Sequence, residues 1–287
     1  MIASTDIWPQ DRLIAPTIMH VLPPRKPDSH KGDFGSVGLL GGATGMTGAL
    51  LLCARAALYL GAGKVYAASL ADKFGPDLLH PELMWLHPEQ MLEQEMTVFA
   101  VGPGYGRSKS AQQYLAVAIQ SSAILVLDAD ALNLLAASQS LKKTIGLRTG
   151  PTLLTPHPGE AAALLGCDAK TIQLDRLAAA IRLAAEYRAW VVLKGAGSIC
   201  VAPDGDWRIN TTGNPGLSSP GTGDVLTGIL AALLAQDLSP FIALQLAVYL
   251  HGAAADSLLR QGIGPVGLTA SEVLVEARNL LNGKMPP

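Results

Sequence analysis

The sequence predicts an α/β fold, built on a mostly parallel central sheet with helices on both faces. Short segments that are apolar throughout alternate with longer segments of helical periodicity. A strand that is apolar throughout is buried on both faces, which is typical of parallel sheets whose connections are helices. Glycine-rich or polar clusters follow directly after such strands: GGATG, GPGYG, DAD, TPHPGE and KGAGS. Because ligands bind at the carboxyl ends of parallel strands, we expect these clusters to form one rim.

The elements are expected to follow a proline-rich N-terminal arm. Residues 1–30, and the few up to about residue 33, have little periodicity and should lie extended on the body of the protein. Strands are expected at 36–40, 64–69, 97–101, 124–127, 152–154 and 190–193, then as a hairpin at 199–202 and 207–209. Helices are expected at 49–60, 108–120, 159–166, 171–187, 224–236, 239–260 and 270–281. With no internal repeat or linker, residues 1–287 are expected to form a single domain.

Composition narrows the possible functions. Hydrophobic residues make up 49% and charged residues 15% of the chain, as in a well-buried globular protein. The net charge of −2 gives no electrostatic case for binding nucleic acid. Cys53, Cys167 and Cys200 lie far apart, so we expect three buried thiols and no metal site. The apolar stretches stop short of the ~20 residues that a membrane span needs, and no secretory signal is visible. We therefore expect a cytoplasmic protein that does not bind membranes.

The stretch from Asn210 to Gln236 contains the strongest local signal for a ligand. Gly221-Thr222-Gly223-Asp224 leads directly into an apolar helical pattern. The first N–H groups of a helix have no partner within the helix, and glycines let a ligand approach them closely. Together with the helix dipole they form an anion site that suits phosphate. Asp224 would lie beside this anion as a general base, although Asp is also common near helix starts as a simple cap.

Other candidate groups follow the strands. Lys194 could bind a phosphate or be a solvated charge, and His157 could bind a ligand or only hold its own loop. Asp128 and Asp130 could act at the rim or cap the following helix, and Glu160 lies in the same set of loops. No nucleophile motif and no zinc-ligand spacing is present. The pattern favours a phosphate-bearing ligand.

The same segments carry a family resemblance. In order along the chain they are HKGDFGSVGLLGG, GMTGALLLCARAALYLGAGKV, VGPGYG, LVLDADALNLL, LLTPHPGE, VVLKGAGSICVAPDG and GNPGLSSPGTGDVLTGILAALLAQ. They resemble the ADP/ATP-dependent NAD(P)H-hydrate dehydratase family of the ribokinase-like superfamily. GTGD alone indicates only the superfamily, whereas TPHPGE and the long glycine-rich stretch before the helix are more specific.

The resemblance implies a cofactor-repair reaction. The enzyme would restore NADH or NADPH from the (6S) hydrate, consuming ADP or ATP with the help of Mg2+. The ring hydroxyl would be phosphorylated and the phosphate then eliminated, with ADP giving AMP and phosphate. Asp224 would be the base, and it would line the hydrate site with Ala49, Gly104 and His157. The nucleotide would bind Lys194, Gly195, Ala196, Gly197, Ser198 and Gly223. The N–H groups of Gly221, Thr222 and Gly223 would form the anion hole.

The resemblance also sets expectations about partners. Many relatives carry an N-terminal epimerase domain, for which about 30 residues leave no room. The protein is therefore expected to act on the S form and to rely on a separate epimerase, or on spontaneous epimerisation, for the R form. The family tends to form tetramers. Pro220 departs from the usual pattern and removes one backbone donor beside the anion site.

Two alternatives remain open at this stage. One is a ribokinase-like kinase that phosphorylates a small alcohol, such as a hydroxyethylthiazole or a sugar. The other is a non-catalytic nucleotide-binding subunit, which would have no need for a carboxylate at position 224. The sequence does not decide between ADP and ATP, or between the NADH and NADPH hydrates.

Overall fold

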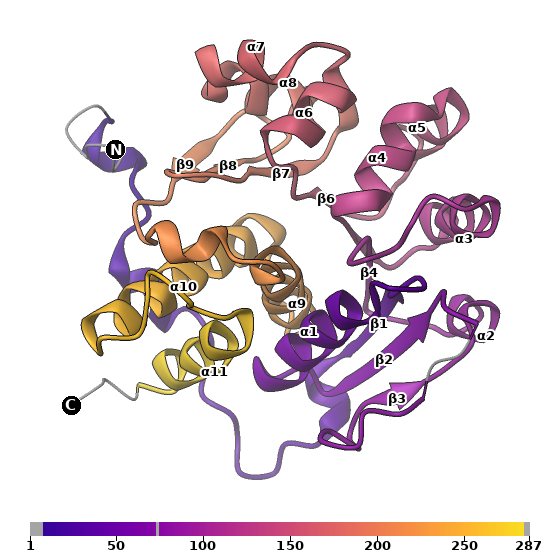
Figure 1. Ribbon diagram of the computed structural model, residues 1–287, viewed down its shortest axis with the longest axis horizontal. Helices are drawn as coiled ribbons and strands as arrows, with labels where there is room; N and C mark the ends of the chain where they lie inside the picture. Colours follow the sequence, from indigo (N-terminus) through magenta and orange to yellow (C-terminus); the bar gives the residue numbers. More distant parts are fainter. Residues whose placement is uncertain (1–7, 73–74, 284–287) are drawn as a thin grey trace.

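The computed structural model describes residues 8–72 and 75–283, and its centre is one sheet. The strands are β1 (Ser36–Gly41), β2 (Lys64–Ser69), β3 (Met84–Trp85), β4 (Val98–Val101), β5 (Ile124–Leu127), β6 (Thr152–Leu154), β7 (Trp190–Leu193), β8 (Ile199–Val201) and β9 (Trp207–Ile209). Their order across the sheet is β3-β2-β1-β4-β5-β6-β7-β8-β9 (Figure 1). Strands from β3 to β7 run parallel, and β8 is antiparallel to β7 and β9. The prediction of a mostly parallel sheet is confirmed.

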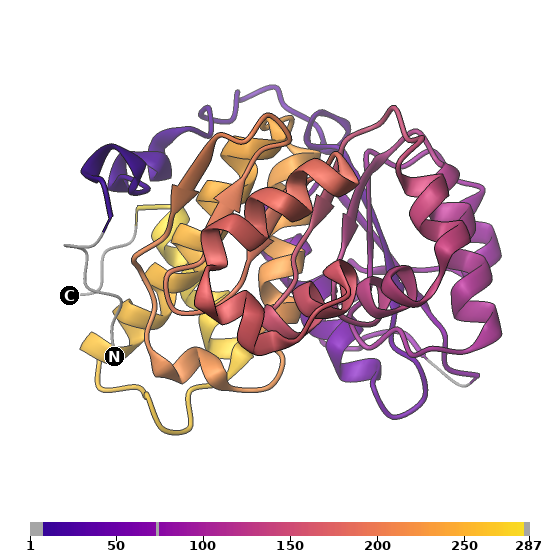
Figure 2. The ribbon, with the colours of Figure 1, turned by 90° about the horizontal axis from the view of Figure 1, so that it is seen from above.

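Helices cover both faces of the sheet (Figures 1 and 2). One core holds α1 (Thr47–Tyr59), α9 (Thr222–Ala235), α10 (Pro240–Arg260) and α11 (Ala270–Leu281). The other holds α2 (Pro88–Leu92), α3 (Lys109–Gln120), α4 (Ala129–Ala137), α5 (Gln139–Ile145), α6 (Pro158–Leu165), α7 (Ala169–Leu174) and α8 (Arg176–Tyr187). Strand residues alternate between the cores: Val98 and Ala100 face the first, Phe99 and Val101 the second. This explains why the strands are apolar throughout.

The sequence-based prediction differs from the structure in the shorter elements. Residues 171–187, expected as one helix, belong to two, because Asp175 leaves the helical conformation and its side chain accepts the N–H of Ala178 at 2.9 Å. That contact caps α8 and ends the preceding helix. Four elements are not predicted from the sequence, each nine residues long or shorter: β3, α2, α4 and α5. Elements of that length contain too few turns or alternations for a periodic pattern to stand out.

The N-terminal arm lies against the edge of the sheet. Ile14 donates its N–H to the carbonyl oxygen of Ile209 in β9 at 2.9 Å, and Arg12 forms a 2.6 Å ion pair with Asp206. The arm is not continuously extended as expected, because it contains the short 3₁₀ turns Gln10–Arg12, Pro16–His20 and Lys31–Phe34. The first seven positions of the predicted arm lie outside the described residues.

Two further expectations about buried residues have mixed outcomes. Cys53 and Cys200 are buried free thiols, but Cys167 is only partly buried. Among the described residues, α10 is one helix long and apolar enough to cross a membrane. However, 72% of its apolar window is buried inside the protein, as expected for a core helix.

Candidate active site at the start of α9

The start of α9 provides free backbone donors at the carboxyl end of the sheet. The helix begins at Thr222, two residues earlier than the sequence analysis places it, after Gly221 in a left-handed conformation with φ of 87°. This conformation favours glycine, and a Cβ at Gly221 would also lie 2.4 Å from Cδ1 of Leu52, whose side chain would have to move. The first backbone hydrogen bond within the helix is donated by the N–H of Val225 to the carbonyl oxygen of Gly221 at 3.0 Å. The N–H groups of the preceding helix-start residues are therefore available to an anion.

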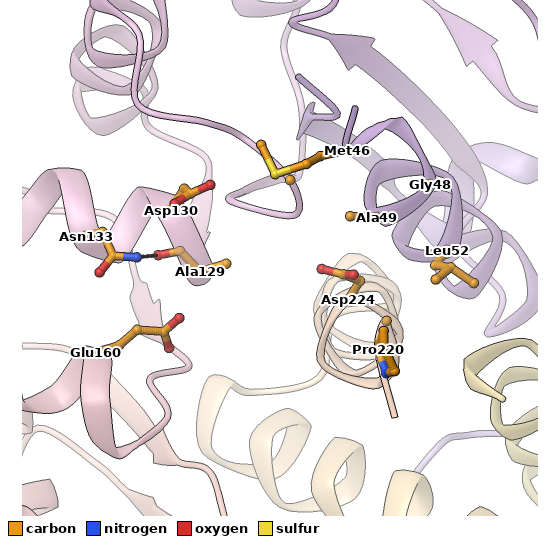
Figure 3. A pocket seen from close by; sticks show the side chains of 12 residues that line it. Met46, Gly48, Ala49, Leu52, Ala129, Asp130, Asn133, Glu160, Pro220 and Asp224 are labelled. Carbon is orange, nitrogen blue, oxygen red and sulfur yellow. Dashed lines mark hydrogen bonds between the residues drawn. The ribbon is translucent and has the colours of Figure 1, made fainter. Parts of the chain in front are cut away.

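A cavity of about 490 Å³ lies on one side of this helix start (Figure 3). Carboxylates reach it from three elements: Asp130 from α4, Glu160 from α6 and Asp224 from α9. Its other lining residues are Met46, Gly48, Ala49, Leu52, Gly104, Ala129, Asn133, Pro220 and Gly221. We call this the carboxylate cavity.

A second cavity, of about 650 Å³, lies on the other side of the helix start. It is lined mainly by three segments of the chain: Lys194–Ser198, residues 210–215, and the Thr222–Gly223 start of α9. Other lining residues are His157, Pro158, Leu217, Ser218, Leu226, Val248, His251 and Gly252. We call this the loop cavity. The two cavities share the first turn of α9 as a wall, because Gly221 and Asp224 line one and Thr222 and Gly223 line the other.

The structure distributes the predicted site residues between these two cavities. Ala49, Gly104, Gly221 and Asp224 line the carboxylate cavity. The predicted nucleotide-binding residues all line the loop cavity: Lys194, Gly195, Ala196, Gly197, Ser198 and Gly223. His157, predicted from the family resemblance to contact the hydrate, lines the loop cavity rather than the carboxylate cavity. Its predicted role in hydrate binding therefore stays a prediction.

Gly104 brings the loop after β4 close to the start of α1. Its φ is 57°, and a Cβ there would lie 2.5 Å from the carbonyl oxygen of Met46 and 3.1 Å from the Cβ of Ala49. Glycine is therefore required for these two loops to meet. Met46, Ala49 and Gly104 all line the carboxylate cavity, so this contact forms part of its wall.

Lys194 is held at the centre of the site by a buried network. Its Nζ lies 2.7 Å from Oδ1 of Asp128, and Oγ1 of Thr227 in α9 donates to the other carboxylate oxygen at 2.7 Å. The Lys194 side chain is 19% exposed and that of Asp128 only 2%. Burial alone would raise the pKa of Asp128, but the attraction and hydrogen bond of Lys194 outweigh it and lower the pKa. Asp128 is thus a partner of Lys194 and not a helix cap, since its side chain makes no cap hydrogen bond.

Asp224 and Glu160 have strongly perturbed pKa values. Burial, and then repulsion from the charge of Asp128, raise the pKa of Asp224 to about 7. Burial is also the main cause that raises the pKa of Glu160 to about 7, opposed by attraction to Lys194. A carboxylate with a pKa near neutrality can both take and release a proton at physiological pH. Perturbed carboxyl groups in a cavity are typical of an active site.

His157 and Glu160 form the cap of α6 at the boundary between the cavities. Nδ1 of His157 accepts the N–H groups of Gly159 and Glu160 at 3.0 and 3.3 Å. Oε2 of Glu160 accepts the N–H of His157 at 2.8 Å. Because Nδ1 accepts, the proton of the neutral ring is on Nε2. The expectation that His157 holds its own loop is therefore met.

Side chains that the sequence analysis did not single out hold the loop cavity together. Arg176 in α8 donates to the carbonyl oxygens of Leu193, Lys194 and Ala196 at 3.1, 3.3 and 2.6 Å. On the other wall, Asp256 in α10 accepts the N–H of Gly213 at 2.8 Å. These anchors are distant in sequence from the loops that they hold, so no local motif reveals them.

Two further observations concern the polar groups near the loop cavity. Nε2 of His251 is buried with no hydrogen-bond partner among the described residues, and burial lowers the pKa of this ring to about 4. The ring is therefore neutral. Within residues 8–72 and 75–283, no three His, Cys, Asp or Glu side chains form a cluster that could hold a metal ion.

Comparison with known proteins identifies the family. Residues 37–276 match the family model described as NAD(P)H-hydrate dehydratase. An ADP-dependent (S)-NAD(P)H-hydrate dehydratase of Neisseria meningitidis is 41% identical over 92% of this chain and 90% of the relative. A bifunctional NAD(P)H-hydrate repair enzyme of Escherichia coli is 39% identical over 94% of this chain. The match spans about half the length of that relative, 52%.

Solved structures agree with this comparison. An ADP/ATP-dependent NAD(P)H-hydrate dehydratase from Bacillus subtilis, co-crystallised with ATP and Mg2+, superposes with a TM-score of 0.82 at 31% identity, over 94% of this chain and 96% of that one. A hydroxyethylthiazole kinase from Pyrococcus horikoshii has a TM-score of 0.59 at 18% identity, over 88% of this chain and 89% of that one. This second likeness shows a common ribokinase-like fold alone. The chain belongs to the NAD(P)H-hydrate dehydratase family.

Proposed function

We propose that the protein restores NADH or NADPH from the (6S) hydrate in a reaction that converts ADP into AMP and phosphate. One observation carries the proposal beyond family membership: two cavities meet at a single helix start, with a carboxylate of raised pKa on one side. A phosphoryl group bound at that helix start is within reach of ligands in both cavities. This arrangement suits transfer between a nucleotide and a hydroxyl group.

The roles divide along the shared wall. The nucleotide would bind in the loop cavity against Lys194–Ser198 and Gly223, with the N–H groups of Gly221, Thr222 and Gly223 holding the transferring phosphoryl group. The hydrated ring would lie in the carboxylate cavity beside Ala49 and Gly104, where Asp224 takes the proton of the ring hydroxyl. Pro220 precedes these donors and leaves the three N–H groups in place.

Phosphorylation makes the dehydration chemically accessible. Hydroxide is a poor leaving group, whereas phosphate is a good one, so transfer of a phosphoryl group to the ring hydroxyl prepares the carbon–oxygen bond to break. A kinase-like fold can in this way serve a lyase.

Magnesium would accompany the nucleotide. Mg2+ takes oxygen ligands and is usually held by substrate phosphates, waters and one or two protein groups, not by a dedicated protein cage. The hydroxyl, amide and carbonyl oxygens of residues 210–215 are donors of this class in the loop cavity. When bound, the ion would neutralise charge on the transferring phosphoryl group.

We also propose the cellular setting of the reaction. We propose that the protein acts in the cytoplasm, because its three cysteines are free thiols, which is compatible with a reducing compartment. We propose a homotetramer because the family resemblance implies one, and the exposed apolar residues Leu78, Leu79 and Val266 are compatible with such an assembly. Light scattering of the purified protein would measure the assembly directly. A separate epimerase, or spontaneous epimerisation, would supply the S hydrate.

The first experiment follows the near-UV absorbance of dihydronicotinamide with chemically hydrated NADH as substrate. Wild-type protein and Asp224→Asn are each given Mg2+ with ADP, with ATP or with no nucleotide. Absorbance that returns only with a nucleotide, and not in the variant, supports the dehydratase and identifies the donor. A stable phosphorylated alcohol as product, with no recovery of absorbance, would instead indicate the small-molecule kinase.

A further inference from the structure

The proposed reaction removes protons from two places on the hydrated ring. The hydroxyl loses a proton when its oxygen receives the phosphoryl group. In the elimination step the bond between C6 and this oxygen breaks, and its electron pair leaves with phosphate. The C5–H bond also breaks, and its electron pair forms the C5=C6 double bond. The C5 proton needs an acceptor, and a carboxylate that already holds the hydroxyl proton is unsuited to take it.

Glu160 provides a second carboxylate in the same cavity. Its side chain extends from the first turn of α6, and Figure 3 shows it directed into the cavity from the side opposite Asp224. The residue is only 5% exposed. The two carboxyl groups therefore lie on different sides of a ring bound between them, as two proton transfers at different atoms require.

The capping interaction leaves Glu160 able to accept a proton. A carboxylate has about four lone-pair sites. The backbone N–H of His157 occupies one of them on Oε2, and the ring Nε2 of His157 lies 3.2 Å from Oε1, so about two sites remain for an incoming proton. The raised pKa of about 7, caused mainly by burial, means that the group can take a proton and then return it to solvent near neutral pH.

Asp130, the third carboxylate of this cavity, is less suited to the task. Its Oδ2 accepts the N–H of Gly106 at 3.0 Å, and its Oδ1 pairs with Nε of Arg107 at 3.0 Å. Both carboxylate oxygens are thus engaged by the loop after β4, one of them in an ion pair with a guanidinium. Asp130 therefore ties the loop after β4 to α4.

Capping alone does not explain the burial of Glu160. Glu272 makes the same capping contact in α11, where its Oε2 accepts the N–H of Thr269 at 2.8 Å in an exposed setting. A cap of this kind works at the surface, whereas a buried carboxylate carries a desolvation cost. Burial beside a cavity is the feature that Glu160 has and Glu272 lacks.

We propose that Glu160 is the catalytic base that takes the C5 proton during elimination of phosphate. The inference rests on the proposed dehydratase function. Asp224 and Glu160 then divide the reaction between them, the first serving phosphoryl transfer and the second serving elimination.

The test separates the two steps in a single turnover. Hydrated NADH, ADP and Mg2+ are mixed with excess enzyme, the reaction is quenched at intervals, and AMP and NADH are quantified together. In Glu160→Gln we expect AMP to form at nearly the wild-type rate and NADH at least about 100-fold more slowly. A phosphorylated hydrate should then accumulate and be visible by mass spectrometry. Glu272→Gln is the matched control, and both products should form at wild-type rates.

Each other outcome has a definite meaning. If AMP and NADH appear together in Glu160→Gln, whether at wild-type rates or equally slowed, Glu160 is not the base for elimination. If wild-type protein yields no NADH with any nucleotide, the proposed function fails, and this inference fails with it. Thermal melting and ADP affinity report whether the variant folds. If Glu160→Gln does not fold, Glu160→Asp replaces it, because it keeps the negative charge but shortens the side chain by one methylene. The proposal then requires that NADH formation slows while AMP formation does not.

Discussion

The two cavities on either side of α9 are built in different ways. Charged side chains project into the carboxylate cavity, and two of them, Asp224 and Glu160, have pKa values raised to about 7. The loop cavity is lined mainly by the loop segments 194–198 and 210–215, and Arg176 and Asp256 hold these loops through hydrogen bonds to their backbone. The difference teaches that proton chemistry is concentrated on one side of the helix start and ligand binding on the other. Substitutions on the two sides should therefore separate catalysis from affinity.

Asp224→Asn should have the largest effect, and this effect should be on catalysis in the carboxylate cavity. The amide keeps the size of the side chain but takes no proton from the ring hydroxyl, so we expect the rate of NADH recovery to fall about 10³-fold. The dissociation constant for ADP, measured by calorimetry, should change little because the loop cavity is intact. A large loss of ADP affinity would contradict the division between the two cavities.

Asp128→Asn should have the next largest effect, on stability. Lys194 would remain largely buried without its counter-charge, and we expect the free energy of unfolding to fall by about 3 kcal/mol. Urea denaturation measures this directly. The control is Glu186→Gln, which removes an exposed ion pair with Arg182 in α8 and should cost less than about 0.5 kcal/mol. Equal effects of the two substitutions would show that the buried network is not special.

Arg176→Lys should affect binding more than chemistry. A lysine ammonium does not reproduce the planar fork that reaches three carbonyl oxygens, so the segment 194–198 would lose part of its support. With about 1 kcal/mol for each hydrogen bond lost, we expect the KM for ADP to rise about tenfold. The maximal rate of NADH recovery should change less than this KM. Arg182→Lys, on the same helix but outside the lining of the cavity, should leave both unchanged.

The dependence on pH should be the mildest of these effects. As the pH rises towards 7, activity should increase while the contribution of Asp224 to stability should decrease. Asp224 acts as a base only when ionised, so kcat/KM should fall as the pH drops below about 7. Because its folded pKa is raised, Asp224 binds protons more tightly in the folded state, and its contribution to stability decreases as the pH rises towards 7. Asp224→Asn should therefore gain stability relative to wild type as the pH rises from about 4 to about 7, the interval between the unfolded and folded pKa values. An unchanged difference in melting temperature would argue against the raised pKa.

The sequence predicts the parts of this molecule that are local in the chain. The strands of the parallel core and the rim at their carboxyl ends follow from apolar runs and from the glycine loops after them. Gly221 and Gly104 could be singled out because positions with positive φ or a close backbone approach favour glycine, which is recognisable in the sequence.

The contacts between distant segments could not be predicted in this way. The sequence is equally compatible with Asp128 as a helix cap and as an active-site carboxylate. Only the contact with Lys194, 66 residues later, decides its role. Arg176 likewise has no local signature, since its partners lie 17 to 20 residues away. The burial that raises the pKa of Glu160 depends on packing around the whole cavity, while TPHPGE predicts a loop of the rim but not the burial of its glutamate.

The N-terminal arm has a consequence for solubility. A terminal strand such as β9 offers unpaired backbone N–H and carbonyl groups that can recruit a strand from another molecule. Here Ile14 occupies the carbonyl oxygen of Ile209, and the Arg12–Asp206 ion pair fastens the arm beside it. At the opposite edge, β3 is only two residues long and offers little to a foreign strand. By covering this edge, the arm hinders edge-to-edge aggregation, an effect separate from catalysis.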